Sequence, residues 1–493
     1  MRLRRVLAAP ALALLSLTIA AGPAVAGKPG TWTKLDSGAR TDVAAEPTLA
    51  RSSNGTLHVA FPQHGSTSYS TVHVPVSTAG AKGTASTVVS GWSSMTFDPV
   101  LELDRTRGYD LYLPALAGTS GPLANGNLVD AYSQNATSWA IMGGATTPLY
   151  YSAQGASLDE GLDVATLSGG ETVSAYTTGS NTIHVLVDHS TDYAVADTLT
   201  ITRSPASVQV LDPALVTSGS TVRLVWFQWG SGTDGVYTAQ VYPVPSSVTV
   251  TKAPGSSTKY DGKQQAVSPD TPGRTPLVAR AGGGVYTAYC VGYPSCAHIA
   301  LWRVGATKAV TVPGSKNAMH VALSPGPGGR LWLSWYDYSS GGHIKAVRTN
   351  AAATRFGPVR TIALPKGNSP YALQVDGSRT VVAAPADIVV NTGASTSAPG
   401  SKGVFHTQVL AGLTLKAAPT SWRHTTAKRV VFTVADAGAA VKGAVVKAAG
   451  RKCTTSTHGT CALTFPKTRA KGTFKATVTK SGYAGASLTL KRT

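Results

Sequence analysis

Carboxylates are the first place to look for chemistry in this sequence, because acidic residues are scarce. Protein-catalysed cleavage of a glycosidic bond uses two placed carboxylates, or a tyrosine nucleophile with an acidic partner. Asp159, Glu160 and Asp337 are the candidates, with a structural role as the competing interpretation of each. Asp98 and Asp212 precede prolines, where an aspartate commonly caps a turn by accepting backbone N–H groups. The pattern assigns a catalytic role to none of them.

Aromatic residues divide into those that recur in a repeated pattern and those that follow it. The recurring ones predict packing within sheets. Those beyond the repeat fall in loops that would gather on one face, where a flat ring can stack on a sugar. With the adjacent Asp337, the predicted ligand-binding residues are Trp229, Tyr293, Trp335, Tyr336, Asp337 and Tyr338.

Nothing in the sequence indicates a metal or a cofactor. The histidines are dispersed, and His184, His298 and His343 share nearly the same position of a repeated strand. The chain has no H-E-x-x-H helix, nucleophile elbow or phosphate-binding loop. We therefore expect neither.

The four cysteines form two local pairs, Cys290 with Cys296 and Cys453 with Cys461. Zinc sites favour a tighter C-x-x-C spacing with a second pair nearby, which neither pair shows. An even number of cysteines in an exported chain favours disulfides. We predict two disulfides, the second stapling a hairpin that turns at His458 and Gly459.

One pattern recurs along most of the chain: an apolar residue, a Gly- or Ser-bearing turn, then an alternating strand ending on an aromatic residue 11 or 12 positions later. A third strand follows most copies, and a weaker fourth can follow. Copies starting 45 to 63 residues apart predict four-stranded propeller blades. The starts are Leu49, Leu101, Val164, Leu215, Val278, Leu323 and the degenerate Leu373.

These copies predict an all-β fold, a β-propeller of about seven four-stranded blades, with six or eight as alternatives. Residues 31–35 precede the first blade and residues 403–409 follow the last, so pairing these two segments would close the ring. A pair of β-sandwiches is the competing fold, but it predicts no common motif. No apolar helical stripe extends over ten residues beyond the N-terminal segment.

Charge marks a second domain. Residues 411–493 contain fifteen Lys and Arg but one acid, Asp436, a net charge of +14 out of +20 for the chain. Six short strands in this stretch predict a small immunoglobulin-like β-sandwich. Such asymmetry suggests an anionic partner surface. Nucleic acid is not the expected partner, because few aromatic residues alternate with the basic ones.

The N-terminus has the pattern of a secretory signal peptide, with Arg2, Arg4 and Arg5 before an apolar stretch and a small-residue cleavage site at residues 24–26. A retained membrane anchor is the alternative. We predict a signal peptide at 1–26, a propeller at 27–410 and a basic sandwich at 411–493. The expected mature protein is secreted, extracellular, monomeric and without a transmembrane segment.

Segments 440–446 (AVKGAVV), 454–460 (TTSTHGT) and 480–483 (KSGY) resemble bacterial immunoglobulin-like and carboxypeptidase-regulatory-like domains, with Ser456 where aspartate is usual. The repeats and segment 355–359 (RFGPV) resemble the sialidase-type propeller superfamily of secreted actinobacterial proteins. This chain lacks that family's S-x-D-x-G-x-T-W box, with only a faint echo at 231–235, and lacks its Arg-Ile-Pro. The resemblance therefore transfers no catalytic residue.

Two functions are consistent with these observations. The first is a non-catalytic binding protein, whose propeller loops hold a polysaccharide or protein ligand while the basic module adheres to an anionic surface such as a cell-wall polymer. The second, by analogy of fold alone, is a divergent glycoside hydrolase or lyase. An extracellular scaffold without a small ligand is a third interpretation.

Overall fold

The computed structural model describes residues 29–36, 40–41, 46–64, 69–92, 99–103, 111–118, 127–141, 161–178, 181–188, 195–256, 274–292, 295–339, 341–365, 368–393 and 402–493. Over these residues the protein is all-β, with a short 3-10 turn, η1 (Pro327–Gly329), before β23. The signal peptide predicted at 1–26 lies outside them. No helix among the described residues is long and apolar enough to cross a membrane.

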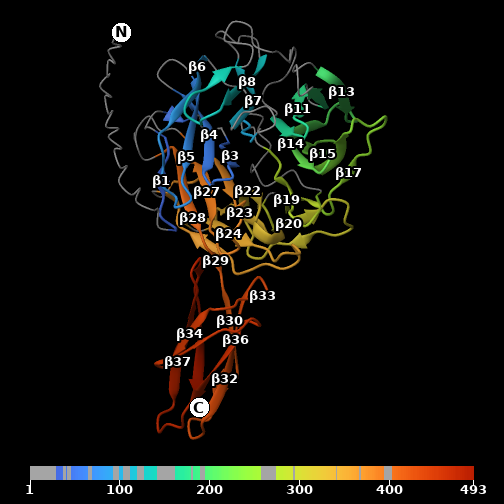
Figure 1. Ribbon diagram of the computed structural model, residues 1–493. Coiled ribbons are helices and arrows are strands. Elements are labelled where there is room, and N and C mark those ends of the chain that lie inside the picture. The colour runs from blue at the N-terminus through green and yellow to red at the C-terminus, as the bar shows by residue number, and fades with distance from the viewer. Residues whose placement is uncertain are drawn as a thin grey trace, which may run out of the picture.

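Before residue 411, the described residues form seven separate sheets, mostly antiparallel four-stranded units in chain order. Figure 1 shows them grouped in one rounded, propeller-like body. Sheet 1 has β2 (Arg40–Thr41), β3 (Thr48–Arg51), β4 (Leu57–His64), β5 (Tyr69–Val76) and β6 (Ser86–Trp92). Sheet 2 has β7 (Leu111–Gly118), β8 (Asn127–Ser133) and β9 (Ala140–Ile141). Sheet 3 has β10 (Leu162–Thr166), β11 (Thr172–Thr178), β12 (Thr182–Asp188) and β13 (Val195–Thr202).

The remaining four sheets of this body follow the same plan. Sheet 4 has β14 (Gln209–Ser218), β15 (Thr221–Trp229), β16 (Gly235–Tyr242) and β17 (Thr251–Lys252). Sheet 5 has β18 (Leu277–Ala279), β19 (Val285–Val291), β20 (His298–Arg303) and β21 (Val310–Thr311). Sheet 6 has β22 (Ala318–Pro325), β23 (Leu331–Asp337), β24 (His343–Arg348) and β25 (Arg360–Ile362). Sheet 7 has β26 (Ala372–Asp376), β27 (Ala386–Asn391), β28 (Val404–Val409) and β1 (Thr33–Lys34).

The ends of this region meet in one sheet, as the sequence suggested. Strand β1 pairs with β28 in antiparallel register, Thr33 opposite His406. Among the first strands, β10, β14, β18, β22 and β26 contact one another in turn, and β26 contacts β3. Most recurring aromatic residues pack between sheets; Phe61, Trp226 and Trp335 are buried in core clusters. In the degenerate last copy the second strand starts at Ala386, two residues beyond the expected end, because residues 377–385 make a longer connection than a hairpin turn.

Residues 411–493 form a separate elongated module below the rounded body (Figure 1). One sheet contains β30 (Thr414–Ala418), β32 (Lys428–Asp436), β33 (Ala439–Ala440) and β36 (Thr460–Phe465). The other has the order β31 (Ser421–Trp422), β39 (Ala486–Arg492), β37 (Gly472–Thr479), β34 (Val445–Ala448), β35 (Arg451–Thr454). A short parallel pair, β29 (Ala411–Gly412) with β38 (Tyr483–Ala484), packs against the propeller-like body through Ala411 and Tyr483.

The module has its own core between the two sheets, including Trp422, Phe432, Phe465 and Val478. Alternating inward residues on β32 and β37 supply it, which is the period-two pattern expected of strands buried on one face. The burial is local to residues 411–493, so the core and the charge asymmetry delimit the same segment.

Candidate functional site

The best single predicted contact, Asp337, lies at the end of β23 and is engaged within its own sheet. Its Oδ2 forms an ion pair with Lys345 Nζ at 2.5 Å, and its Oδ1 accepts hydrogen bonds from Ser339 N at 3.0 Å and Ser339 Oγ at 2.6 Å. Burial alone would raise the pKa of Asp337, but Lys345 and Ser339 lower it below the ordinary value. Asp337 is therefore placed to hold the turn after β23.

The aromatic residues around Asp337 differ in exposure. The Trp335 side chain is fully buried in the cluster between sheets 5 and 6, so its ring is not available at the surface. Tyr336 is 8% exposed, and its hydroxyl is 2.9 Å from Ser369 Oγ. Tyr338 is half-buried against the cluster of sheets 6 and 7. An unpredicted neighbour, Tyr371, is 44% exposed and precedes β26.

The structure describes some of the other predicted site residues but not all of them. Trp229, the last residue of β15, is half-buried against the cluster of sheets 4 and 5. Asp159, Glu160 and Tyr293 lie outside the described residues, so their candidacy stays a prediction.

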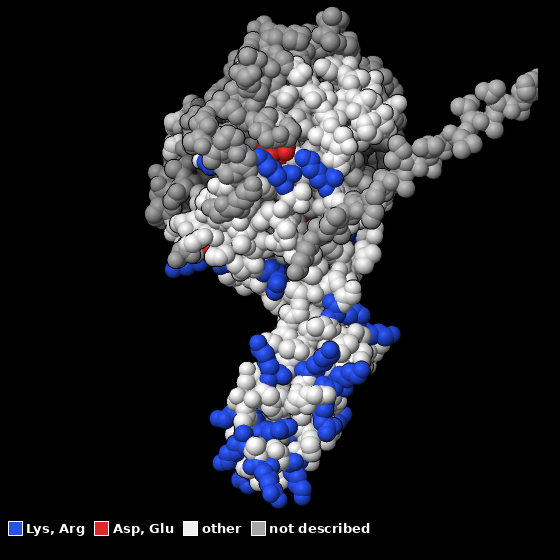
Figure 2. All heavy atoms as spheres, turned by 90° about the vertical axis from the view of Figure 1, so that its left-hand side faces the viewer, with Lys and Arg blue, Asp and Glu red and all other residues white. Residues whose placement is uncertain are grey.

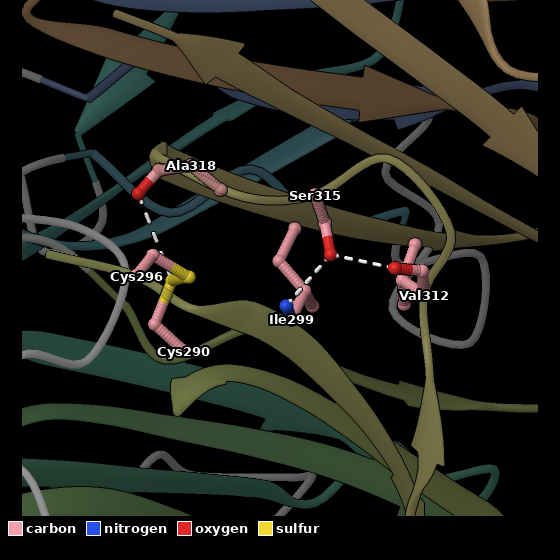
Figure 3. The surroundings of a disulfide bond; sticks show 6 residues. All are labelled: Cys290, Cys296, Ile299, Val312, Ser315 and Ala318. Carbon is pink, nitrogen blue, oxygen red and sulfur yellow. Dashed lines mark hydrogen bonds between the residues drawn. A yellow bond between two sulfur atoms is a disulfide. The ribbon is translucent and has the colours of Figure 1, made fainter. Parts of the chain in front are cut away.

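Both predicted disulfides are present. Cys290–Cys296 closes the loop between β19 and β20, the loop of Tyr293. Figure 3 shows it near Ser315, whose Oγ accepts from Ile299 N at 2.8 Å and donates to the Val312 carbonyl at 2.6 Å. The Cys453–Cys461 bond does not staple a hairpin ladder as expected. Cys453 is in β35 and Cys461 in β36, which belong to different sheets, so this bond joins the sandwich across its edge.

A polar pocket of about 170 Å³ lies where the first strands of the sheets converge. Six of the seven sheets and residues 100–102, which precede sheet 2, contribute to it, which places it near the axis about which the sheets are arranged. Threonine, glutamine, carboxylate and arginine side chains alternate with aliphatic ones around it. The polar lining residues are Thr48, Glu102, Asp163, Arg274, Thr275 and Gln374.

Arg274 links the charged groups of this pocket. Its Nη1 is 3.5 Å from Asp163 Oδ1, and its Nε is 3.9 Å from Glu46 Oε2. The Arg274 backbone N–H also donates to Glu46 Oε2 at 3.0 Å, and Nη1 donates to the Pro99 carbonyl at 3.2 Å. One guanidinium thus joins Asp163 of sheet 3 to Glu46 and Pro99, which precede sheets 1 and 2 along the chain.

Asp163 has a raised pKa in this pocket. Burial raises its pKa to about 6, against the lowering influence of Arg274 and of the Leu215 N–H, which donates to Oδ2 at 2.7 Å. The side chain therefore changes charge near neutral pH. A carboxyl group in this condition can donate a hydrogen bond or a proton as well as accept one.

The sequence contained a weak signal for this pocket. Glu46-Pro47 and Thr275-Pro276 mark the starts of first strands, and Asp163 adjoins the predicted acids Asp159 and Glu160. The sequence did not show that these segments converge on one pocket, because Glu46 and Arg274 are 228 positions apart. Among the described residues, no three His, Cys, Asp or Glu side chains gather closely enough to hold a metal ion.

No protein-family model matches this chain, and no curated protein does either. Solved structures similar to it include a polysaccharide lyase, the PL25 ulvan lyase, at 9% identity over 76% of this chain and 94% of that one, with a TM-score of 0.46. The SapL1 lectin in complex with alpha methyl fucoside is 13% identical over 66% and 98%, TM-score 0.41. The NanB sialidase from Streptococcus pneumoniae is 9% identical over 76% and 70%, TM-score 0.38. Likeness at this level assigns no activity or ligand to this chain.

Proposed function

We propose that this chain is an exported, monomeric carbohydrate-binding protein in two parts. Residues 27–410 form a seven-bladed propeller of the sialidase-type superfamily, closed by β1, and its axial pocket receives one unit of a glycan. Residues 411–493 form an immunoglobulin-like module that adheres to an anionic extracellular surface. A polysaccharide is the proposed ligand, and a protein is the alternative ligand for the same binding role.

The single observation that supports a binding role is the axial pocket itself. The pocket of about 170 Å³ has polar groups among aliphatic ones; Thr48, Asp163 and Gln374 are held on strands, and Arg274 and Thr275 lie just before β18. Fixed donors and acceptors at close range suit a polyhydroxylated ligand, because each sugar hydroxyl can both donate and accept. The ion pairs of Arg274 fix the geometry of the lining groups before the ligand arrives.

The test is binding of the purified protein to a panel of neutral and acidic glycans, comparing wild type with Gln374→Leu and Thr275→Val. These changes remove lining hydrogen-bonding groups while nearly preserving side-chain volume. We expect at least a tenfold loss of affinity for a bound glycan, since an unpaired polar contact costs about 1–3 kcal/mol. Tyr338→Ala plus Asp337→Ala tests the predicted loop face instead.

The outcomes are distinct. If the pocket variants lose glycan binding and the loop variant retains it, the ligand site is the axial pocket. The reverse result moves the ligand to the loop face, and absence of any glycan binding refutes the carbohydrate role. Thr361→Val, which alters a surface hydroxyl away from this pocket, serves as the matched control.

A divergent glycoside hydrolase or lyase is the second candidate, because the pKa of Asp163 is raised to about 6 beside Glu46 and Arg274. A raised pKa in a polar pocket is a common property of a general acid. Each glycan that binds is therefore also assayed for new reducing ends or unsaturated products. Turnover by wild type that falls at least a hundredfold in Asp163→Asn favours this candidate.

A further inference from the structure

The outer face of the five-stranded sheet of the C-terminal module has an unusual composition. Strands alternate inward and outward residues, and the outward residues of β39, β37, β34 and β35 are cationic or hydroxyl-bearing, with Val445 the exception. The exposed cations on this face are Arg423, Lys447, Lys452, Lys475 and Lys491. Their aromatic neighbours in sequence, Trp422 and Phe474, point into the core.

Strand register arranges these cations in a row. Lys491 lies opposite Thr473, two residues before Lys475; Lys447 lies opposite Thr477, two residues after it. Each step therefore crosses one strand, about 5 Å, and advances two residues, about 7 Å, for a Cα spacing of about 8 Å. Both steps run in the same diagonal direction.

The row extends at both ends. Ser421 pairs with Lys491 in parallel register, and Arg423 lies two residues further along the same diagonal. Hydrogen bonds between His424 N and the Thr493 carbonyl at 2.9 Å, and between Thr493 N and the Trp422 carbonyl at 2.9 Å, continue that pairing. At the other end, Lys452 lies directly opposite Lys447.

No carboxylate side chain of the module is available to neutralise this row. Its one acid, Asp436, is 2% exposed and pairs with Arg348 and Arg330 of the propeller-like body. On the face of the module seen in Figure 2, blue side chains are scattered among white ones, and no red is visible. Like charges directly across a strand pair, as at Lys447 and Lys452, destabilise a sheet, and ordinary solvated surfaces mix both signs. An external anion would relieve this repulsion.

We propose that this face, the lysine diagonal, binds a polyanionic polysaccharide lying along the row, with sulfate or carboxylate groups at the cations and sugar hydroxyls at the intervening threonines. Thr473, Thr477 and Thr489 stand directly across from lysines, within the same face. This inference rests on the proposed adhesive role of the module and specifies its ligand class and position.

Other anionic partners fit the face less well. Single-stranded nucleic acid is held by aromatic platforms, and the rings of this sheet point inward. Reading of duplex DNA uses a helix or a ribbon that enters a groove, whereas this is a broad sheet face. A membrane-binding surface needs exposed apolar residues, of which the face offers only the half-buried Val445.

The experiment measures binding of the full chain to dextran sulfate, polygalacturonate, neutral dextran and duplex DNA between about 50 and 200 mM salt. The test variant is Lys447→Gln, Lys475→Gln, Lys491→Gln. The control variant, Lys416→Gln, Lys442→Gln, Lys467→Gln, removes the same charge from exposed positions off this face. A Lys→Arg triple at the test positions retains the charge and verifies that the sheet tolerates substitution.

We expect the affinity of the test triple to fall at least tenfold at the lower salt concentration. The slope of log affinity against log salt concentration should fall in magnitude by about two to three, because three cationic contacts are lost. The control should lose under threefold, and the Lys→Arg triple should retain binding. Binding of either charged glycan supports the proposal, and the stronger one identifies the anion. Equal loss in both Gln triples, or tighter binding to DNA than to both glycans, overturns it. If wild type binds no anionic polymer, the adhesive role itself fails.

Discussion

At the scale of single residues, burial of the Asp163 carboxyl group has a free-energy cost that packing does not explain. Its carboxyl group is buried, and Arg274 compensates for that burial only in part, so its pKa stays near 6. An acid whose folded-state pKa is raised binds its proton more tightly when folded. Its contribution to stability is thus present below the unfolded pKa near 3.8 and is lost as pH rises through 6.

Asp163→Asn should therefore stabilise the protein at pH 8. The amide keeps an acceptor for the Leu215 N–H, and no charge has to be desolvated. We expect a gain of roughly 2–3 kcal/mol at pH 8 relative to wild type, and almost none at pH 4, measured by urea denaturation at both pH values. Equal effects at the two pH values would contradict the assignment. A stabilised variant that no longer binds glycan would mark Asp163 as retained for function.

At the scale of elements, the seam between sheets 7 and 1 closes the body through a buried charge network. Arg51 of β3 pairs with Asp376 and with Asp387 of β26 and β27, the latter at 2.5 Å. His406 Nε2 lies 2.8 Å from Asp387 Oδ1, and Arg379 Nη2 lies 2.7 Å from Oδ2. Burial would raise the pKa of Asp387, but the His406 hydrogen bond and the surrounding cations lower it to about 2.

Acid should open this seam. Because the folded-state pKa of Asp387 lies below its unfolded value near 3.8, its contribution is present above pH 3.8 and is lost as pH falls through 2. Wild type should lose about 2 kcal/mol from this group over that interval, whereas Asp387→Asn, less stable at pH 7, should show a correspondingly flatter decline. Unfolding free energies from pH 2 to 6 provide the comparison. Parallel curves for the two proteins would place the acid sensitivity elsewhere.

The elements also show what a sequence can and cannot predict. Repeated apolar alternation and Gly-bearing turns predicted the first and second strands of most sheets, because hairpin pairing is local. The pairing of β1 with β28 followed only from the need to close a ring. The network at Asp387 could not be foreseen, since its Arg51 partner is 336 positions away and neither residue has a distinguishing local pattern. The axial pocket was missed for the same reason. The ion pair of Asp337 with Lys345 was not foreseen either, and a ligand contact at Asp337 stays a prediction.

At the scale of the whole molecule, one buried arginine joins the two parts. Arg348 Nη2 pairs with Asp436 Oδ2 at 2.5 Å, and Nη1 donates to the Val382 carbonyl at 2.5 Å. The guanidinium also lies 5.4 Å from the centre of the Trp332 ring and 5.6 Å from that of Tyr483, one ring from each part. Asp436, the only acidic residue of the basic module, thus helps to fix the position of that module relative to the propeller-like body.

Arg348→Ala should uncouple the module from the propeller-like body. Removing one partner of a buried ion pair leaves Asp436 without its main counter-charge and costs about 3–5 kcal/mol. We expect calorimetry to resolve two thermal transitions where wild type has one, and small-angle scattering to report a wider distribution of dimensions. Arg303→Ala, at the exposed last residue of β20, the corresponding strand of sheet 5, is the matched control and should behave as wild type. If Arg348→Ala lowers a single transition without separating it, the arginine stabilises the body alone. The orientation of the lysine diagonal must then be set by the packing of Ala411 and Tyr483 against sheets 6 and 7.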